Sequence, residues 1–185
     1  SGSFAADMNF LQRALGSDAA AWADEFGTAK DVSALSAERN VFRYRPLPVT
    51  IRLSENQPLD ALVRVAAAGL LAGSALRVST GVELPPALRA VLTELGMPVR
   101  EENDAEWLAS AATFDPAVSG TRIRLIGSGA SQLATALGGR PDVAVYANPV
   151  TEAGRVELLP FLHEQAVSIT AHRFGTPNHL SDALI

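Results

Sequence analysis

The strongest constraint on the fold is a regular alternation of short apolar strands and amphipathic helices between residues 49 and 146. Each predicted strand is followed by a helical stripe, and glycines mark most of the helix ends. The pattern predicts an α/β fold with a parallel, doubly wound, five-stranded sheet and right-handed crossovers. The predicted strands lie at 49–53, 75–78, 99–101, 121–126 and 142–146, and the predicted helices lie at 59 to about 73, 84–95, 103–111 and 128–137.

The segments outside this repeat have patterns of their own. Helical spacing from Phe4 to Phe26 is interrupted at 16–18, which predicts two short N-terminal helices. Residues 41–45 predict a strand that ends at Pro46, and residues 166–172 predict a half-buried strand. We expect a tag remnant at 1–3 and a fragment of a longer chain. The expected divisions are N-terminal helices and linker at 4–38, a main domain at 39–149 that begins with a strand segment at 39–46, a second strand-containing segment at 150–173 and a tail at 174–185.

Composition excludes several classes of function. The 185-residue chain has no cysteine, so it has no thiol nucleophile, thiolate metal site or disulfide. Lys30 is the only lysine and the net charge is −5, so we expect no nucleic-acid partner. Asp60, Arg64 and Gly73 interrupt the longest apolar stretch, so we expect no transmembrane segment. Serine, carboxylate or histidine side chains would have to perform any chemistry.

Candidate motifs for chemistry are weak. Gly127-Ser128-Gly129 lies where a strand meets a helix and could hold a phosphate, but a capping role for Ser128 is the favoured interpretation. The three histidines lie at spacings that match no metal motif, so we expect no metal site. The acids between 101 and 106 surround a predicted helix start, so we expect them to be solvated and to complement the helix dipole. Asn103 and Glu106 have the spacing of a capping box.

The order and spacing of several segments resemble the cofactor-binding half of aldehyde dehydrogenases, and this resemblance implies a Rossmann-like domain. It covers most of residues 39–148, and its segments are Arg45-Pro46-Leu47-Pro48-Val49, Asn56-Gln57-Pro58, Ala72-Gly73-Ser74-Ala75-Leu76 and Ile126-Gly127-Ser128-Gly129.

A more specific resemblance lies at the end of the chain. Residues 154–162 and 165–178 resemble the C-terminus of the bacterial proline utilization A family. Members are bifunctional enzymes that oxidise proline to glutamate, with FAD in a proline dehydrogenase domain and NAD in a glutamate-semialdehyde dehydrogenase domain. Longer members end in a non-catalytic domain that is like an aldehyde dehydrogenase, and the resemblance identifies this chain with that domain in a cytoplasmic parent enzyme.

Departures from the aldehyde dehydrogenase pattern imply that this fragment has no catalytic residue and binds no cofactor. The chain has no cysteine nucleophile, Ser79 stands where the family has a ribose-binding lysine, and the general-base glutamate has no counterpart. Asn56 matches the oxyanion-binding asparagine, but without a nucleophile we interpret it as a turn or cap residue. The remaining vestigial candidates are Gly127, Ser128 and Gly129.

The resemblance also implies a two-stranded flap formed by residues 40–45 and 166–173. In the parent the flap would pack on the semialdehyde dehydrogenase domain, while the tail helps to close the substrate-channelling cavity. In isolation the chain would form a homodimer through the flap. The alternative function is a degenerate dehydrogenase-like module that binds NAD or another phosphate ligand at 127–130. The expected interface residues are Val41, Phe42, Tyr44, Val167, Ile169, Phe174, Leu180, Leu184 and Ile185.

Overall fold

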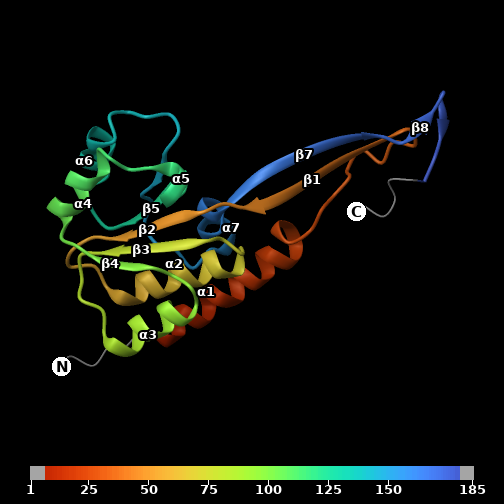
Figure 1. Ribbon diagram of the computed structural model, residues 1–185. Helices are drawn as coiled ribbons and strands as arrows, with labels where there is room; N and C mark the ends of the chain where they lie inside the picture. Colours follow the sequence, from red (N-terminus) through yellow and green to blue (C-terminus); the bar gives the residue numbers. More distant parts are fainter. Residues whose placement is uncertain (1–6, 180–185) are drawn as a thin grey trace.

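A five-stranded parallel sheet forms the centre of the molecule (Figure 1). The computed structural model describes residues 7–179. The strand order β4-β3-β2-β5-β6 puts the reversal of winding between β2 and β5. This arrangement confirms the predicted doubly wound, Rossmann-like fold. The strands are β2 (Val49–Leu53), β3 (Leu76–Thr80), β4 (Val99–Glu101), β5 (Arg122–Ile126) and β6 (Ala144–Tyr146).

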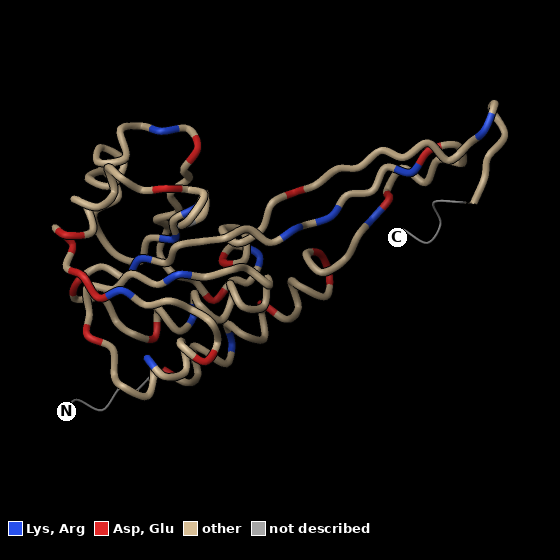
Figure 2. The backbone as a smooth tube through the Cα atoms, viewed as in Figure 1, with Lys and Arg blue, Asp and Glu red and all other residues tan. Residues whose placement is uncertain are grey.

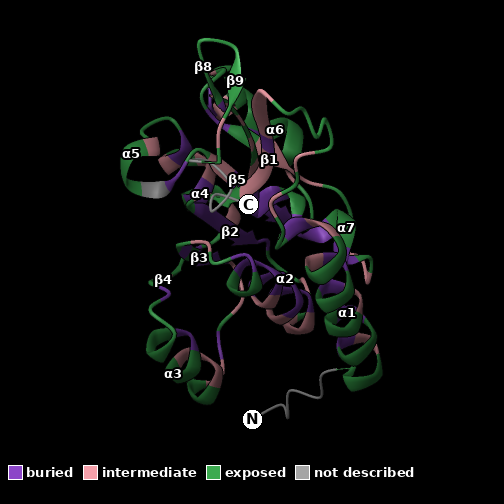
Figure 3. Ribbon diagram, turned by 90° about the vertical axis from the view of Figure 1, so that its right-hand side faces the viewer, coloured by how far each residue is buried: buried purple, intermediate pink, exposed green. Residues whose placement is uncertain are grey.

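Helices cover both faces of this sheet (Figure 1). One face carries α1 (Met8–Ala21), α2 (Leu59–Leu71) and α3 (Pro86–Glu94). The other face carries α4 (Asp104–Ala111), α5 (Pro116–Ser119) and α6 (Ala130–Ala136). The buried apolar side chains accordingly form two clusters, one on each face, and the buried residues concentrate in the central layers (Figure 3).

The N-terminal segment forms one continuous helix, α1, followed by a short π-helix, η1 (Trp22–Phe26). The predicted break at 16–18 is therefore wrong. The helix continues because tertiary contacts hold this turn: Asp18 pairs with Arg64 of α2 at 2.6 and 2.8 Å, and the Ser17 hydroxyl accepts from the amide of Gly154. Burial raises the pKa of Asp18, an effect that Arg64 opposes.

A two-stranded antiparallel arm extends away from the body of the molecule (Figure 1). Its strands, β1 (Glu38–Pro46) and β7 (Leu162–Thr170), confirm the predicted pairing of the two flap segments. Strand β1 leads almost directly into β2, while α7 (Gly154–Glu157) and the 3-10 helix η2 (Leu159–Phe161) precede β7. A small hairpin of β8 (His172–Arg173) and β9 (Thr176–Pro177) lies at the far end. We call β1 and β7 the flap and this hairpin the tip.

Candidate functional site

The flap leaves one strand edge open. The backbone N–H and C=O of Phe42 both bond to Lys30, so these groups point away from β7. Phe42 stands opposite Ala166, so the N–H and C=O groups of Ala166 point away from β1. Because these groups alternate along a strand, those of Glu164 and Ser168 point away from β1 as well. No other strand of the described residues pairs with β7. An edge of this kind can accept a further strand.

One face of the flap is already occupied at its base. The ring of Tyr44 packs edge-to-face on Phe26 of η1 and on Phe42, at centroid distances of 4.8 and 5.3 Å. The Tyr44 hydroxyl donates to Glu25 at 3.3 Å. Burial raises the pKa of Tyr44, and the negative charge of Glu25 adds to this effect. Phe42 and Tyr44, expected at an interface, therefore also fasten the flap to the N-terminal helices.

The other expected interface residues differ in exposure. Val41 is only 4% exposed, so its side chain is not open to a partner. Val167 and Ile169 are half-buried on the same face of the flap as Val41. Phe174 is 94% exposed. Leu180, Leu184 and Ile185 lie outside the described residues.

The tip presents Phe174 in an unusual backbone conformation. Phe174 has φ 52° and Gly175 has φ 83°, so both central residues of the turn are left-handed. An aromatic residue with positive φ is strained, by roughly 1–3 kcal/mol. The Gly175 amide donates to His172 Nδ1 at 3.2 Å, and the Arg173 guanidinium lies 5.5 Å from the Phe174 ring centroid. The turn thus projects an aromatic ring and an arginine, the side chains that most often anchor protein interfaces.

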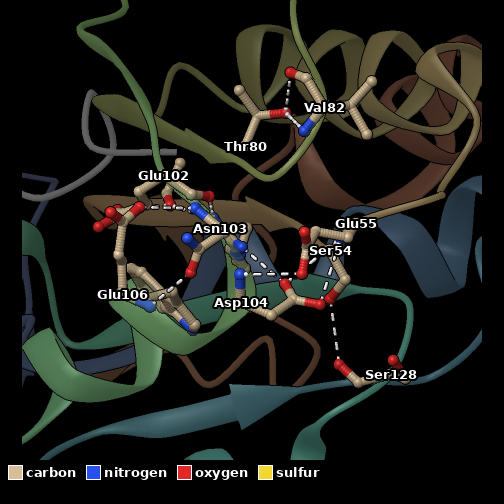
Figure 4. Close-up of polar contacts among 12 residues, drawn as sticks. Ser54, Glu55, Thr80, Val82, Glu102, Asn103, Asp104, Glu106 and Ser128 are labelled. Carbon is tan, nitrogen blue, oxygen red and sulfur yellow. Dashed lines mark hydrogen bonds and ion pairs between the residues drawn. The ribbon is translucent and has the colours of Figure 1, made fainter.

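The carboxyl edge of the central sheet is where doubly wound folds bind ligands. Here Asp104 accepts from Arg52 at 2.6 Å and from the amide of Glu55 at 3.3 Å (Figure 4). The Ser54 hydroxyl donates to the carbonyl of Ser128 at 3.1 Å and links the ends of β2 and β5. Acidic residues gather at this edge (Figure 2), so a ligand phosphate placed near Glu55 and Asp104 would meet like charge.

The vestigial cofactor candidates have structural roles in this arrangement. Ser79 lies in β3, where its hydroxyl accepts from Arg52 and donates to Glu102, both at 2.8 Å. Asn56 has φ 61°, which confirms the predicted turn, although Pro58 and not Asn56 is the N-cap of α2.

The glycine loop between β5 and α6 is tightly packed on one side. A Cβ at Gly127 would stand 2.7 Å from Gln57 Cγ. The N-cap of α6 is Gly129, with φ 96° and no side-chain cap, so the capping role predicted for Ser128 is wrong. Ser128 instead offers its carbonyl to Ser54. A cavity of about 490 Å³ lies beside this loop, and its lining includes Gln57, Gly127 and Asn148.

The acidic residues around the start of α4 divide into two groups. Asn103 and Glu106 form the predicted capping box, with bonds of 2.8 and 2.9 Å. Glu102 is not solvated as expected, because it is only 7% exposed and its carboxylate meets Ser79 and, at 3.1 Å, Arg100. Sequence periodicity did not indicate this burial, since the glutamate follows a very short edge strand.

Within residues 7–179, no group of three or more histidine, aspartate or glutamate side chains is placed to hold a metal ion. No helix in that range is long and apolar enough to cross a membrane.

The fold is similar to parts of solved enzymes. Proline utilization A (PutA) from Corynebacterium freiburgense is 34% identical over 92% of this chain, with a TM-score of 0.62. A variant of PutA from Bradyrhizobium japonicum is 21% identical over 76% of the chain, with a TM-score of 0.58. Histidinol dehydrogenase from Elizabethkingia anophelis is 15% identical over 78% of the chain, with a TM-score of 0.53, and the match covers 36% of that protein.

The chain spans only 14% of the C. freiburgense protein and 15% of the B. japonicum protein. No protein-family model and no curated protein sequence matches it. The similarity therefore concerns one portion of a much longer enzyme.

Proposed function

We propose that this chain is a non-catalytic, aldehyde-dehydrogenase-like domain of a bifunctional enzyme that oxidises proline to glutamate in the bacterial cytoplasm. FAD and NAD would be bound by other domains of that parent enzyme. The observation that carries the proposal is the flap, an arm with an open strand edge and an exposed aromatic tip. The similarity to PutA supports this choice of parent enzyme.

In the proposed complex the flap packs on the semialdehyde dehydrogenase domain. The outward amides of Ala166 and Ser168 would receive strand hydrogen bonds, while Val167, Ile169 and Phe174 would contribute apolar contact. The tail beyond residue 179 would extend this contact and help to seal the channelling cavity. A seal of this kind keeps the semialdehyde intermediate from escaping between the two active sites.

Removal of residues 174–185 from the full-length enzyme tests this role. We expect lower semialdehyde oxidation and a lag in NADH formation from proline, with unchanged proline dehydrogenase activity. A matched control replaces only the exposed Val32 by serine and should change neither activity. Unchanged semialdehyde oxidation and no lag after truncation would contradict the sealing role.

An NAD titration separates this proposal from the alternative of a nucleotide-binding module. The Ser79 hydroxyl is already hydrogen-bonded to Arg52 and Glu102. Glu55 and Asp104 place negative charge at the carboxyl edge of the sheet, where a nucleotide would bind. We therefore expect calorimetry of the 185-residue chain to show no saturable binding at micromolar NAD. Saturable binding would favour the nucleotide module instead.

A further inference from the structure

A second cavity lies on the face of the sheet, away from both the flap and the carboxyl edge. It has a volume of about 400 Å³ and is walled by β3, β4, the second half of α4 and the segment 113–118. We call it the sheet-face cleft. It exists because Trp107, Ala111 and Phe114 pack over β5, which leaves the outer strands β3 and β4 without a helix above them on this face.

Two arginines line the cleft on neighbouring strands. Ser79 stands opposite Arg100, and strand alternation puts Arg77 on the same face as Ser79. Both arginine side chains lie at the cleft wall and are exposed. Cations on adjacent strands repel one another unless a negative charge lies between them.

The protein's own carboxylates do not fully neutralise this pair. Glu102 meets Arg100 at 3.1 Å, but its other oxygen accepts from Ser79, and Asp104 is bonded to Arg52. The side chain of Arg77 makes no hydrogen bond or ion pair with any residue in the described range. Asp115 is on the cleft wall too, where it caps α5 through the amide of Ala117. The positive side of the cleft is therefore the β3–β4 side.

The rest of the wall is largely apolar. Trp107, Phe114 and Val118 contribute to it, and the Trp107 and Phe114 rings meet edge-to-face at 6.5 Å. The indole N–H of Trp107 is buried and has no hydrogen-bond partner among the described residues. Buried donors without an acceptor are rare in folded proteins.

We propose that the sheet-face cleft binds a small organic carboxylate with an apolar body. The carboxylate would lie between the guanidinium groups of Arg77 and Arg100, which favour planar anions of this kind. The apolar body would contact Phe114 and Val118. A volume of about 400 Å³ is in the range of small-molecule sites. This inference is independent of the role proposed for the flap.

A titration of the 185-residue chain with benzoate, followed by 1H–15N NMR, tests the proposal. The chain has two tryptophans, so the Trp107 indole reports on the cleft and the Trp22 indole on η1 serves as an internal reference. We expect benzoate to shift the Trp107 signal saturably in the millimolar range and to leave Trp22 unmoved. Benzyl alcohol, the neutral analogue, should bind at least about fivefold more weakly because it lacks the charge.

Substitutions identify the residues that bind benzoate. Arg77→Gln and Arg100→Gln should each weaken benzoate binding about fivefold or more. The matched control is Arg89→Gln, which removes an arginine paired with Glu101 on the other face of the sheet. This substitution should leave benzoate binding unchanged. A benzoate concentration of 20 mM is roughly twenty times an expected dissociation constant of about 1 mM. No saturation by that concentration would overturn the proposal. Equal binding by both cleft variants, or equal binding of inorganic phosphate, would also overturn it, the latter by showing an adventitious ion only.

Discussion

Three arginines, Arg52, Arg64 and Arg124, have fully buried side chains, and each is paired with a carboxylate. Desolvation of a guanidinium is costly, and a partner at 2.6–2.7 Å offsets that cost only if the geometry is held by the surrounding fold. Each pair joins elements that are distant in the sequence. The Arg64–Asp18 pair joins α2 to α1, and Arg124–Glu157 joins β5 to α7.

Removal of one partner of a buried pair should be far more damaging than removal of a surface pair. Asp18→Ala leaves the Arg64 guanidinium buried without its carboxylate, so we expect a loss of about 3–5 kcal/mol of unfolding free energy. The control is Arg13→Ala, which breaks the exposed pair with Glu152 and should have little effect. Urea denaturation measures both, and equal effects of the two substitutions would contradict this view of Asp18.

Two glycines should respond to alanine in opposite directions. A Cβ at Gly154 would lie 2.5 Å from the Ser17 carbonyl oxygen and 2.7 Å from Asp18 Cα, so α7 and α1 would have to separate. We expect Gly154→Ala to cost about 1–3 kcal/mol of stability. Gly16, in the middle of α1, has no atom within 4 Å of a Cβ, and Gly16→Ala should stabilise by about 0.5–1 kcal/mol. Thermal unfolding of the two variants shows whether each substitution lowers or raises the stability.

At the scale of elements, α2 is buried over more of its surface than a single helical stripe predicts. A single stripe at helical spacing would bury the apolar Leu70 and expose the charged Arg64, but Leu70 is 40% exposed and Arg64 is fully buried. The reason is that α2 lies between the sheet and α1, so two of its faces are covered. The expected stripe described only one of these two contacts.

The flap should show alternating protection of its amides. The N–H groups of Val167 and Ile169 point to β1, while those of Ala166 and Ser168 point to the open edge. We expect the outward amides to exchange with solvent at least about tenfold faster than the inward ones. Hydrogen exchange followed by NMR measures this alternation. Uniform rates along β7 would mean that the edge is covered or that the flap opens as a whole.

At the scale of the whole molecule, the flap gives the isolated chain a surface that a second copy can cover. We expect a two-fold dimer formed through the flap, because identical open edges can pair with one another. Light scattering measures the mass, and Val167→Lys should shift the equilibrium toward the monomer. A monomeric mass at high concentration that Val167→Lys leaves unchanged would contradict the expectation.

The sequence by itself determined most of the central architecture. The strand–helix alternation predicted the five parallel strands and the helices between them, and the two flap segments paired as expected. The capping box of Asn103 and Glu106 was also predictable. These features depend on backbone hydrogen bonding and on side-chain periodicity over neighbouring residues, so a local stretch of sequence contains the information.

Only the tertiary structure decided which polar groups are buried and where the chain bends. Asp18 meets a partner 46 positions away, and Ser17 meets one 137 positions away, which is why the predicted helix break did not occur. The burial of Glu102 and the position of Arg77 beside an open sheet face depend on strand order in the same way. Such contacts are selected by the packing of whole elements, which no local periodicity encodes.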